Sequence, residues 1–129
     1  MLIKTSELSE EALDWIVAVC ESEDSAYRIT SSGVVTTIIR GKTETKEWEW
    51  NFHPSTNWAQ GGPIIEREGI RVSPSTHAPS VWIASTYDYD QEDWVKNRSG
   101  LTPLIAAMRS YVASKLGDTV EVPDELIIN

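Results

Sequence analysis

The stretch TPLIAAMRSYVASKLG, residues 102–117, carries the clearest structural signal in the chain. Thr102 can cap a helix, Pro103 suits its first turn, and Gly117 supplies a terminal turn. Between them one apolar stripe recurs at helical spacing and consists of Leu104, Ala107, Met108, Tyr111, Val112 and Leu116. The pattern predicts a helix over residues 103–116, and its alanines allow close packing against a sheet.

An earlier helix is predicted over residues 10–20. Ser9 can cap it, Glu10 and Glu11 suit its positive end, and its apolar side consists of Leu8, Ala12, Leu13, Ile16, Val19 and Cys20. Cys20 is the only cysteine of the chain, so it has no partner for an internal disulfide. We interpret it as a buried hydrophobic residue rather than a nucleophile.

Strand patterns fill most of the remaining chain. Strands are predicted within residues 27–52 and 81–87, where β-branched and aromatic residues gather between turn signals. A weak alternation at residues 1–5 allows an initial strand, and the tail 120–129 is expected to be extended, with Pro123 interrupting it. Residues 27–52 are broken at Ser32-Gly33 and Gly41-Lys42, which indicates two or three strands joined by tight turns. We therefore expect one α+β domain over residues 1–129, with the two helices packed against one mainly antiparallel sheet.

Three aromatic residues, Trp48, Trp50 and Phe52, alternate with polar residues at the end of the second strand region. They would share one face of a strand, and such a stripe packs inward in most proteins. The alternative is a platform on which a base or sugar stacks.

The charge of the chain excludes more than it identifies. Acidic residues outnumber basic ones 20 to 11, for a formal net charge of −9, which disfavours binding to a phosphate backbone. Nucleic acid is therefore not an expected partner, whereas an acidic surface is compatible with docking on a basic protein. With neither a signal-peptide pattern nor a long apolar run, we expect no membrane partner and a cytoplasmic location.

Residues 87–94, YDYDQEDW, combine four carboxylates with three aromatic rings. The spacing lacks the glycine and the distal glutamate of a calcium loop. We predict an exposed acidic connection. The two histidines, His53 and His77, lack metal-ligand spacing, so neither a metal site nor a cofactor is predicted.

The stretch PSTNWAQGGPIIE, residues 54–66, is the strongest candidate for a ligand site. Trp58 could stack on a base, Gly61-Gly62 could let the backbone approach an anion, and polar contacts could come from Ser55, Thr56, Asn57 and Gln60. The alternative is a tight turn that leads into a buried strand, with Trp58 filling a gap in the core.

Three basic residues near this stretch or on the later helix could hold a phosphate group, namely Arg67, Arg71 and Arg109. The alternative for each is an ion pair with a surface carboxylate. Classical catalytic patterns are weak, because no nucleophile-elbow sequence is present and a triad with His53 could assemble only in space. No catalytic residue is predicted.

Residues 55–70, residues 102–118, and the opening segments at 4–8 and 12–15 resemble the NinX-like proteins of lambdoid phages. The middle, residues 22–50, is longer than is usual in that family, and Asn57 stands where an aspartate is frequent. The resemblance implies a phage-encoded accessory protein that acts in the cytoplasm of an infected bacterium. It transfers no catalytic residue to this chain.

Three functions are compatible with these observations. The preferred one is a non-enzymatic protein that binds and sequesters a small nucleotide-derived ligand, such as a host immune signal. The second is an acidic module that inhibits a host protein, and the third is a hydrolase or transferase acting on a nucleotide. Because exposed sheet edges favour self-association, we also expect a homo-oligomer.

Overall fold

The computed structural model describes residues 1–8, 10–21, 25–29, 34–39, 42–47 and 52–126. Within them the chain forms the helices α1 (Glu10–Glu21), α2 (Trp58–Glu68) and α3 (Pro103–Leu116), with short 3-10 turns at Thr5–Glu7 and Asp124–Leu126. The strands build three antiparallel sheets. In the first, β1 (Leu2–Lys4) pairs with β8 (Thr119–Glu121). The second consists of β2 (Ser25–Ile29), β3 (Val34–Ile39) and β4 (Lys42–Glu47), and the third of β5 (Arg71–Pro74), β6 (Trp82–Asp88) and β7 (Asp93–Gly100).

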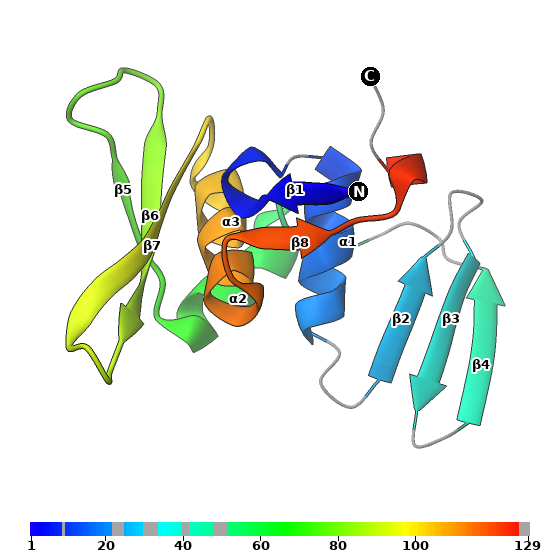
Figure 1. Ribbon diagram of the computed structural model, residues 1–129. Helices are drawn as coiled ribbons and strands as arrows, with labels where there is room; N and C mark the ends of the chain where they lie inside the picture. Colours follow the sequence, from blue (N-terminus) through cyan, green and yellow to red (C-terminus); the bar gives the residue numbers. More distant parts are fainter. Residues whose placement is uncertain (9, 22–24, 30–33, 40–41, 48–51, 127–129) are drawn as a thin grey trace.

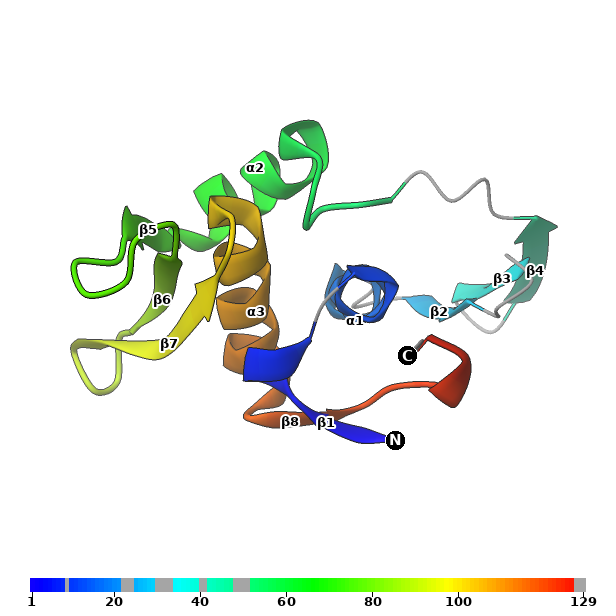
Figure 2. The same ribbon diagram turned by 90° about the horizontal axis from the view of Figure 1, so that it is seen from above.

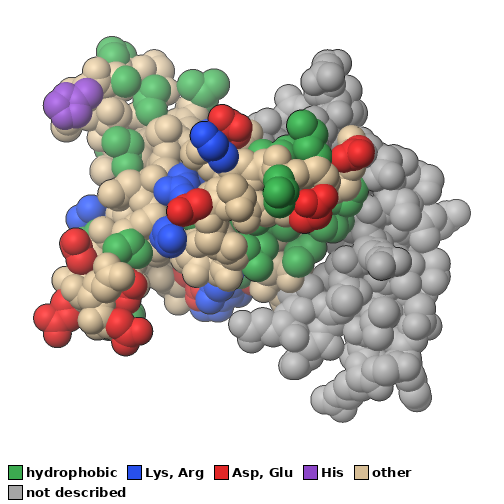
Figure 3. Space-filling model, in the orientation of Figure 1, with side chains coloured by type: hydrophobic (Ala, Val, Ile, Leu, Met, Phe, Trp, Pro, Cys, Tyr) green, Lys and Arg blue, Asp and Glu red, His purple; other side chains and the backbone are tan. Residues whose placement is uncertain are grey.

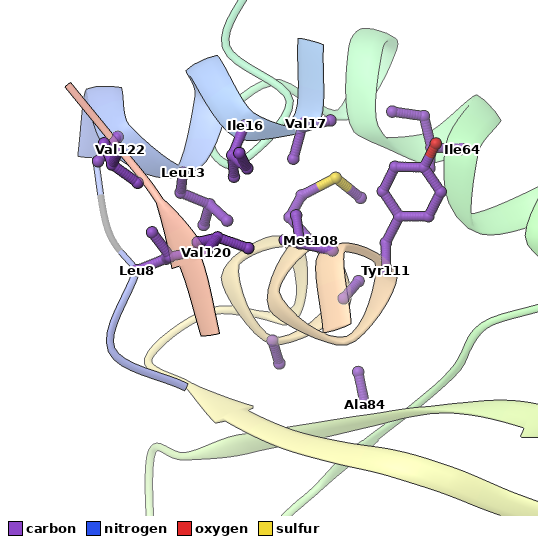
Figure 4. Close-up of a cluster of buried hydrophobic side chains, with 14 of the residues drawn as sticks. Leu8, Leu13, Ile16, Val17, Ile64, Ala84, Met108, Tyr111, Val120 and Val122 are labelled. Carbon is purple, nitrogen blue, oxygen red and sulfur yellow. The ribbon is translucent and has the colours of Figure 1, made fainter. Parts of the chain in front are cut away.

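Helix α3 lies at the centre of the molecule. The β5–β6–β7 sheet lies on one side of it and α1 on the other, while the β2–β3–β4 sheet stands beyond α1 (Figures 1 and 2). Met108 and Tyr111 point from α3 toward α1 and α2, and Ala84 of β6 lies on the opposite side of α3 (Figure 4). The buried cluster includes Leu8, Leu13, Ile16, Val17, Ile64, Ala84, Met108, Tyr111, Val112, Val120 and Val122.

The cap of α3 forms as predicted. The Thr102 Oγ1 accepts the N–H of Ile105 at 3.2 Å, and the N–H of Gly117 donates to the carbonyl of Ala113. The predicted apolar stripe is buried except at Leu116, which is exposed at the end of the helix. Burial also extends beyond the stripe, since Ala106 and Ser110 are as fully enclosed as Met108. This follows from the position of α3, which has α1 on one side and the β5–β6–β7 sheet on the other.

The α+β class and both predicted helices are confirmed, and α1 extends one residue further, to Glu21. β1, β2–β4 and β6 lie in or at the edge of the regions expected to form strands, whereas β5 and β7 lie where the sequence predicts none. The tail, expected to be extended, contains β8 and the 3-10 turn at Asp124–Leu126, and residues 127–129 lie outside the described part. The strands form three separate sheets instead of one. One reason is that α3, rather than a continuous sheet, occupies the middle of the core. The aromatic stripe stays a prediction, because Trp48 and Trp50 lie outside the described residues.

Residues 54–66 differ most from expectation, because they form the cap and most of α2 rather than an irregular turn or a buried strand. The Asn57 side chain accepts the N–H of Ala59 at 2.9 Å, and its carbonyl accepts the N–H groups of Gln60 and Gly61. Gly69, with φ of 62°, ends the helix in the left-handed region that favours glycine.

The glycine pair inside α2 has a packing function at its first member. A Cβ at Gly61 would lie 2.3 Å from the carbonyl oxygen of Pro54 and 2.6 Å from a methyl carbon of Leu104. At Gly62 the nearest atom to such a Cβ, on the Trp58 ring, is 3.9 Å away. The absence of a side chain at Gly61 therefore lets α2 pack directly against α3. It also lets the helix pack against Pro54, in the segment just before α2.

Candidate functional site

The start of α2 is fixed by a buried carboxylate of α1. Asp14 Oδ1 accepts the backbone N–H of Ser55 at 3.0 Å, and its Oδ2 lies 3.4 Å from Nδ1 of His53. Burial raises the pKa of Asp14, and the contacts with Ser55 and His53 only partly oppose the shift. The N–H of His53 in turn donates to Oε1 of Gln60 at 2.5 Å.

Asp14, His53 and Ser55 are not arranged in the order of a nucleophilic triad. In a triad the histidine lies between the nucleophile and the carboxylate, whereas Asp14 here contacts both Ser55 and His53. The Ser55 side chain is also buried, at 2% exposure. The arrangement therefore holds the chain in place before α2 and does not activate the Ser55 hydroxyl.

The candidate residues at the start of α2 divide between solvent and packing. Thr56, Asn57 and Trp58 are exposed, and Trp58 retains 58% of its surface, so it does not fill a gap in the core. Ser55 is buried, Gln60 is half-buried, and Gly61 uses its N–H on the carbonyl of Asn57. Gly62 is partly exposed. Only part of the predicted ligand surface is thus presented to solvent.

The three candidate arginines are engaged in different parts of the fold. Arg67 binds Glu21 of α1 through both terminal nitrogens, at 3.1 and 2.7 Å. Arg71 lies over the ring of Trp94, 4.5 Å from its centroid. Arg109 donates to the carbonyl oxygens of Leu8 and Ser99 at 2.6 and 2.8 Å, and burial lowers its pKa. These contacts join secondary-structure elements, and they do not gather the arginines around Trp58.

A pocket of about 550 Å³ lies at the other end of α2. We call it the tyrosine pocket; it is bordered by the last turns of α2 and α3 and by the β6–β7 hairpin. Its walls are formed by Arg67, Glu68, Thr86, Tyr87, Asp88, Tyr89, Asp90, Val95, Lys96, Ser114 and Lys115. Of the candidates predicted from sequence, only Arg67 is among them.

The cations of the tyrosine pocket are paired with carboxylates. Lys115 Nζ lies 2.8 Å from Glu68, which also contacts Arg67, and Lys96 Nζ lies 3.4 Å from Asp118. Burial raises the pKa of Glu68, but its ion pairs more than reverse this, so the pKa lies below its ordinary value. The attraction of Lys96, followed by the hydrogen bonds of Lys96 and Arg98, lowers the pKa of Asp118.

Lys96 lies in the pocket wall at an irregularity of the β5–β6–β7 sheet. Between the pairs Ala84–Arg98 and Thr86–Val95, β7 contains one more residue than β6, which is a β-bulge. Within it Lys96 has φ of 57°, a left-handed conformation unusual for a lysine. The buried hydroxyl of Ser110 donates to the Lys96 carbonyl at 2.8 Å and helps hold this geometry.

Aromatic rings and carboxylates meet at the tip of the β6–β7 hairpin. The ring of Tyr87 lies edge-on to those of Tyr89 and Trp94, with centroids 4.9 and 5.3 Å away. Tyr89 is 84% exposed. Oδ1 of Asp88 accepts the N–H groups of Asp90 and Gln91, at 2.9 and 3.3 Å. The predicted acidic connection is confirmed as an exposed turn, and its carboxylates gather at one corner of the molecule (Figure 3).

Sequence reasoning missed most of this pocket. The sequence indicates Tyr87, Asp88 and Tyr89 only as part of an acidic connection, and Lys96 and Lys115 carry no local signal of their own. Among the described residues, no cluster of histidine, cysteine or carboxylate side chains could hold a metal ion. None of the described helices is long and apolar enough to cross a membrane.

Fold and pocket together define a small α+β protein with an open pocket of mixed charge. The family model of bacteriophage P22 NinX matches residues 4–115, and the chain belongs to this family. The match begins in β1 and ends in the last turn of α3, so it includes the whole pocket wall. The resemblance seen in the sequence is therefore confirmed. No curated protein matches the chain.

Proposed function

We propose that this phage protein binds a small nucleotide-derived ligand in the tyrosine pocket and holds it without changing it. The main support for this proposal is the combination of groups that line one pocket. They are the rings of Tyr87 and Tyr89, the hydroxyls of Thr86 and Ser114, and the cations of Arg67, Lys96 and Lys115. Rings can stack on a base, hydroxyls can bind polar edges, and a lysine can bind a phosphate.

The size of the pocket supports this proposal. Small-molecule sites commonly have volumes of about 300–1,000 Å³, and the tyrosine pocket has about 550 Å³. Stacking of a base on an aromatic side chain contributes about 1–3 kcal/mol in single-strand binding proteins. Tyr89 is well placed for this, since its exposed ring needs little rearrangement to receive a ligand.

Sequestration rather than turnover is supported by the wall residues. The hydroxyls of Ser114 and Thr86 donate to the backbone carbonyls of Tyr111 and Val95, at 2.6 and 3.4 Å. The two pocket lysines are paired with carboxylates, so none of these groups is placed as an activated nucleophile. A phage protein that binds a host nucleotide signal in the bacterial cytoplasm would lower its free concentration by mass action. Anti-defence by sequestration of an immune signal is the role that we propose.

Native mass spectrometry of protein expressed in bacteria tests this function. We expect a retained small molecule that is recovered chemically intact after denaturation. Two exposed aromatic residues provide a matched pair, because Tyr89 lines the pocket and Trp58 lies at the opposite end of α2. Tyr89→Ala should lose the ligand, whereas Trp58→Ala should retain it.

The opposite result would assign the ligand to the start of α2. Wild-type protein that retains nothing, and takes up nothing from a panel of cyclic nucleotides and ADP-ribose derivatives, would reject the proposal. A recovered molecule that differs from the one supplied would instead support the enzymatic alternative. The same spectra report the number of subunits and so test the expected homo-oligomer.

A second candidate function rests on the tip of the β6–β7 hairpin. Asp90, Glu92 and Asp93 are exposed there together with Tyr89, a combination suited to a basic surface of a host protein. Neutralising Glu92 and Asp93, which do not line the pocket, should weaken salt-sensitive co-purification of a host protein. Unchanged co-purification would exclude this role for the tip.

A further inference from the structure

The charges that line the tyrosine pocket are not equally available to a ligand. Arg67 and Lys115 share Glu68, Arg67 also binds Glu21, and Lys96 lies beside Asp118. By contrast, the structure gives the carboxylates of Asp88 and Asp90 no ion pair with any described residue. The pocket therefore offers unpaired acceptors more readily than unpaired cations.

The two helices that end at the pocket add to this bias. Arg67 and Glu68 belong to the last turn of α2, and Ser114 and Lys115 belong to the last turn of α3. A helix C-terminus carries a partial negative charge of about half an elementary charge, which favours hydrogen-bond donors and cations. A ligand with several phosphates would have to displace carboxylates from lysines against this field.

Asp88 and Asp90 both line the pocket where β6 turns into β7, and Asp88 Oδ1 already accepts two backbone N–H groups. That leaves Asp88 Oδ2 and both oxygens of Asp90 to accept further hydrogen bonds. Two neighbouring carboxylates beside a tyrosine ring match a ribose, whose adjacent hydroxyls donate while the attached base stacks.

We infer that the nucleoside end of the ligand enters the tyrosine pocket, where its vicinal ribose hydroxyls donate to Asp88 and Asp90, and that the pocket holds at most one phosphate, beside Lys96. This inference rests on the proposed function, since it names the part of a nucleotide that the same pocket recognises. It makes the free ribose diol, rather than the number of phosphates, the determinant of selectivity.

The experiment uses the four ribonucleoside 5′-monophosphates and their 2′,3′-dideoxy counterparts as probes, titrated into the full chain by calorimetry or by tyrosine fluorescence. At least one ribonucleotide should bind, and its dideoxy counterpart should bind ~10-fold or more weakly, because charge-assisted hydrogen bonds are lost. The corresponding nucleoside diphosphate and triphosphate should bind no more tightly than the monophosphate.

Two single neutralisations of the same turn separate contact from general charge. Asp90 lines the pocket and Glu92 does not, although both are exposed. Asp90→Asn should reduce the preference for the diol to about twofold or less, since a charge-assisted acceptor is lost. Glu92→Gln should leave the preference unchanged.

The outcomes distinguish this inference from the proposed function. If ribonucleotides and their dideoxy counterparts bind equally, the diol is not read and the inference fails while nucleotide binding stands. A preference that survives Asp90→Asn also overturns it. If none of the probes binds, and native mass spectrometry finds no retained nucleotide, both the inference and the proposed function fail.

Discussion

The two ends of α2 use their residues in different ways. At its start, His53 contacts Asp14 through its ring and Gln60 through its backbone N–H, and Gly61 packs closely against the backbone carbonyl of Pro54. At its end, the helix opens on a pocket bordered by an exposed ring and by a lysine in a left-handed conformation. The segment that looks most like a site in the sequence therefore helps to place α2 and presents only part of its candidate residues to solvent, whereas the pocket is lined by residues that are scattered along the chain.

The largest expected effect is at Gly61, near the start of α2, where a substitution should change stability but not ligand binding. Gly61→Ala should lower the free energy of unfolding by about 2–3 kcal/mol, because the new methyl group meets the Pro54 carbonyl and Leu104. Urea unfolding measures this change. The ribonucleotide affinity of the protein that remains folded should not change, since the pocket lies at the other end of the helix.

Gly62→Ala is the matched control for this substitution. Its methyl group has space, with the nearest atom 3.9 Å away, and alanine is favoured over glycine in a helix by about 0.5–1 kcal/mol. This variant should be as stable as the wild type or more stable. Equal losses at both glycines would show that Gly61 is not a packing contact.

A smaller and opposite effect is expected at the pocket end. Lys96→Gly removes a left-handed lysine and should raise the free energy of unfolding by up to about 1 kcal/mol while weakening ligand binding. Ser80→Gly provides the control, because Ser80 also has a positive φ, of 64°, but does not line the pocket. It should give a similar gain in stability with unchanged binding. A loss of binding in both variants would contradict a specific role for Lys96.

The smallest effect concerns the ionisation of Asp14. Because burial raises its folded-state pKa, the stability linked to its protonated form is present below the unfolded pKa, about 3.9, and is lost as pH rises through the raised value. Asn at this position keeps an oxygen for the Ser55 N–H but cannot ionise. Asp14→Asn should therefore gain stability relative to the wild type as pH rises from about 4 toward neutrality.

Urea unfolding at several pH values measures this difference. Since Asp14 is at the start of α2, nucleotide affinity at neutral pH should be the same in both proteins. A stability difference that is constant with pH would show that the pKa of Asp14 is not raised by folding.

The sequence was sufficient for the elements whose signals are local. The Thr102 cap, Pro103 and Gly117 marked both ends of α3, and the helical spacing of apolar residues located α1. It failed at α2, because Gly-Gly-Pro disfavours a helix by propensity alone. A glycine is needed at position 61 because Leu104, which is distant in the sequence, packs against it. A local sequence pattern cannot reveal that contact.

The pocket was unpredictable for a related reason. Lys96 reaches it only because β7 has an extra residue opposite β6, and that mismatch depends on the pairing of two strands. The sequence indicates Arg67 as a possible anion partner, but its contacts come from Glu21 of α1 and Tyr111 of α3, which are distant in the sequence. Assembly of such a site requires the packing of elements that are not adjacent in the sequence.

The pairing of β1 with β8 bears on how the protein should be prepared. The family match ends at residue 115, yet Val120 and Val122 belong to the core and β8 holds β1 by the register Ile3–Val120. An expression clone trimmed to the matched segment would uncover the apolar side chains of Leu8 and Leu13, and the product would tend to precipitate. Clones intended for crystals or titrations should extend at least through Leu126, which is also buried in that cluster.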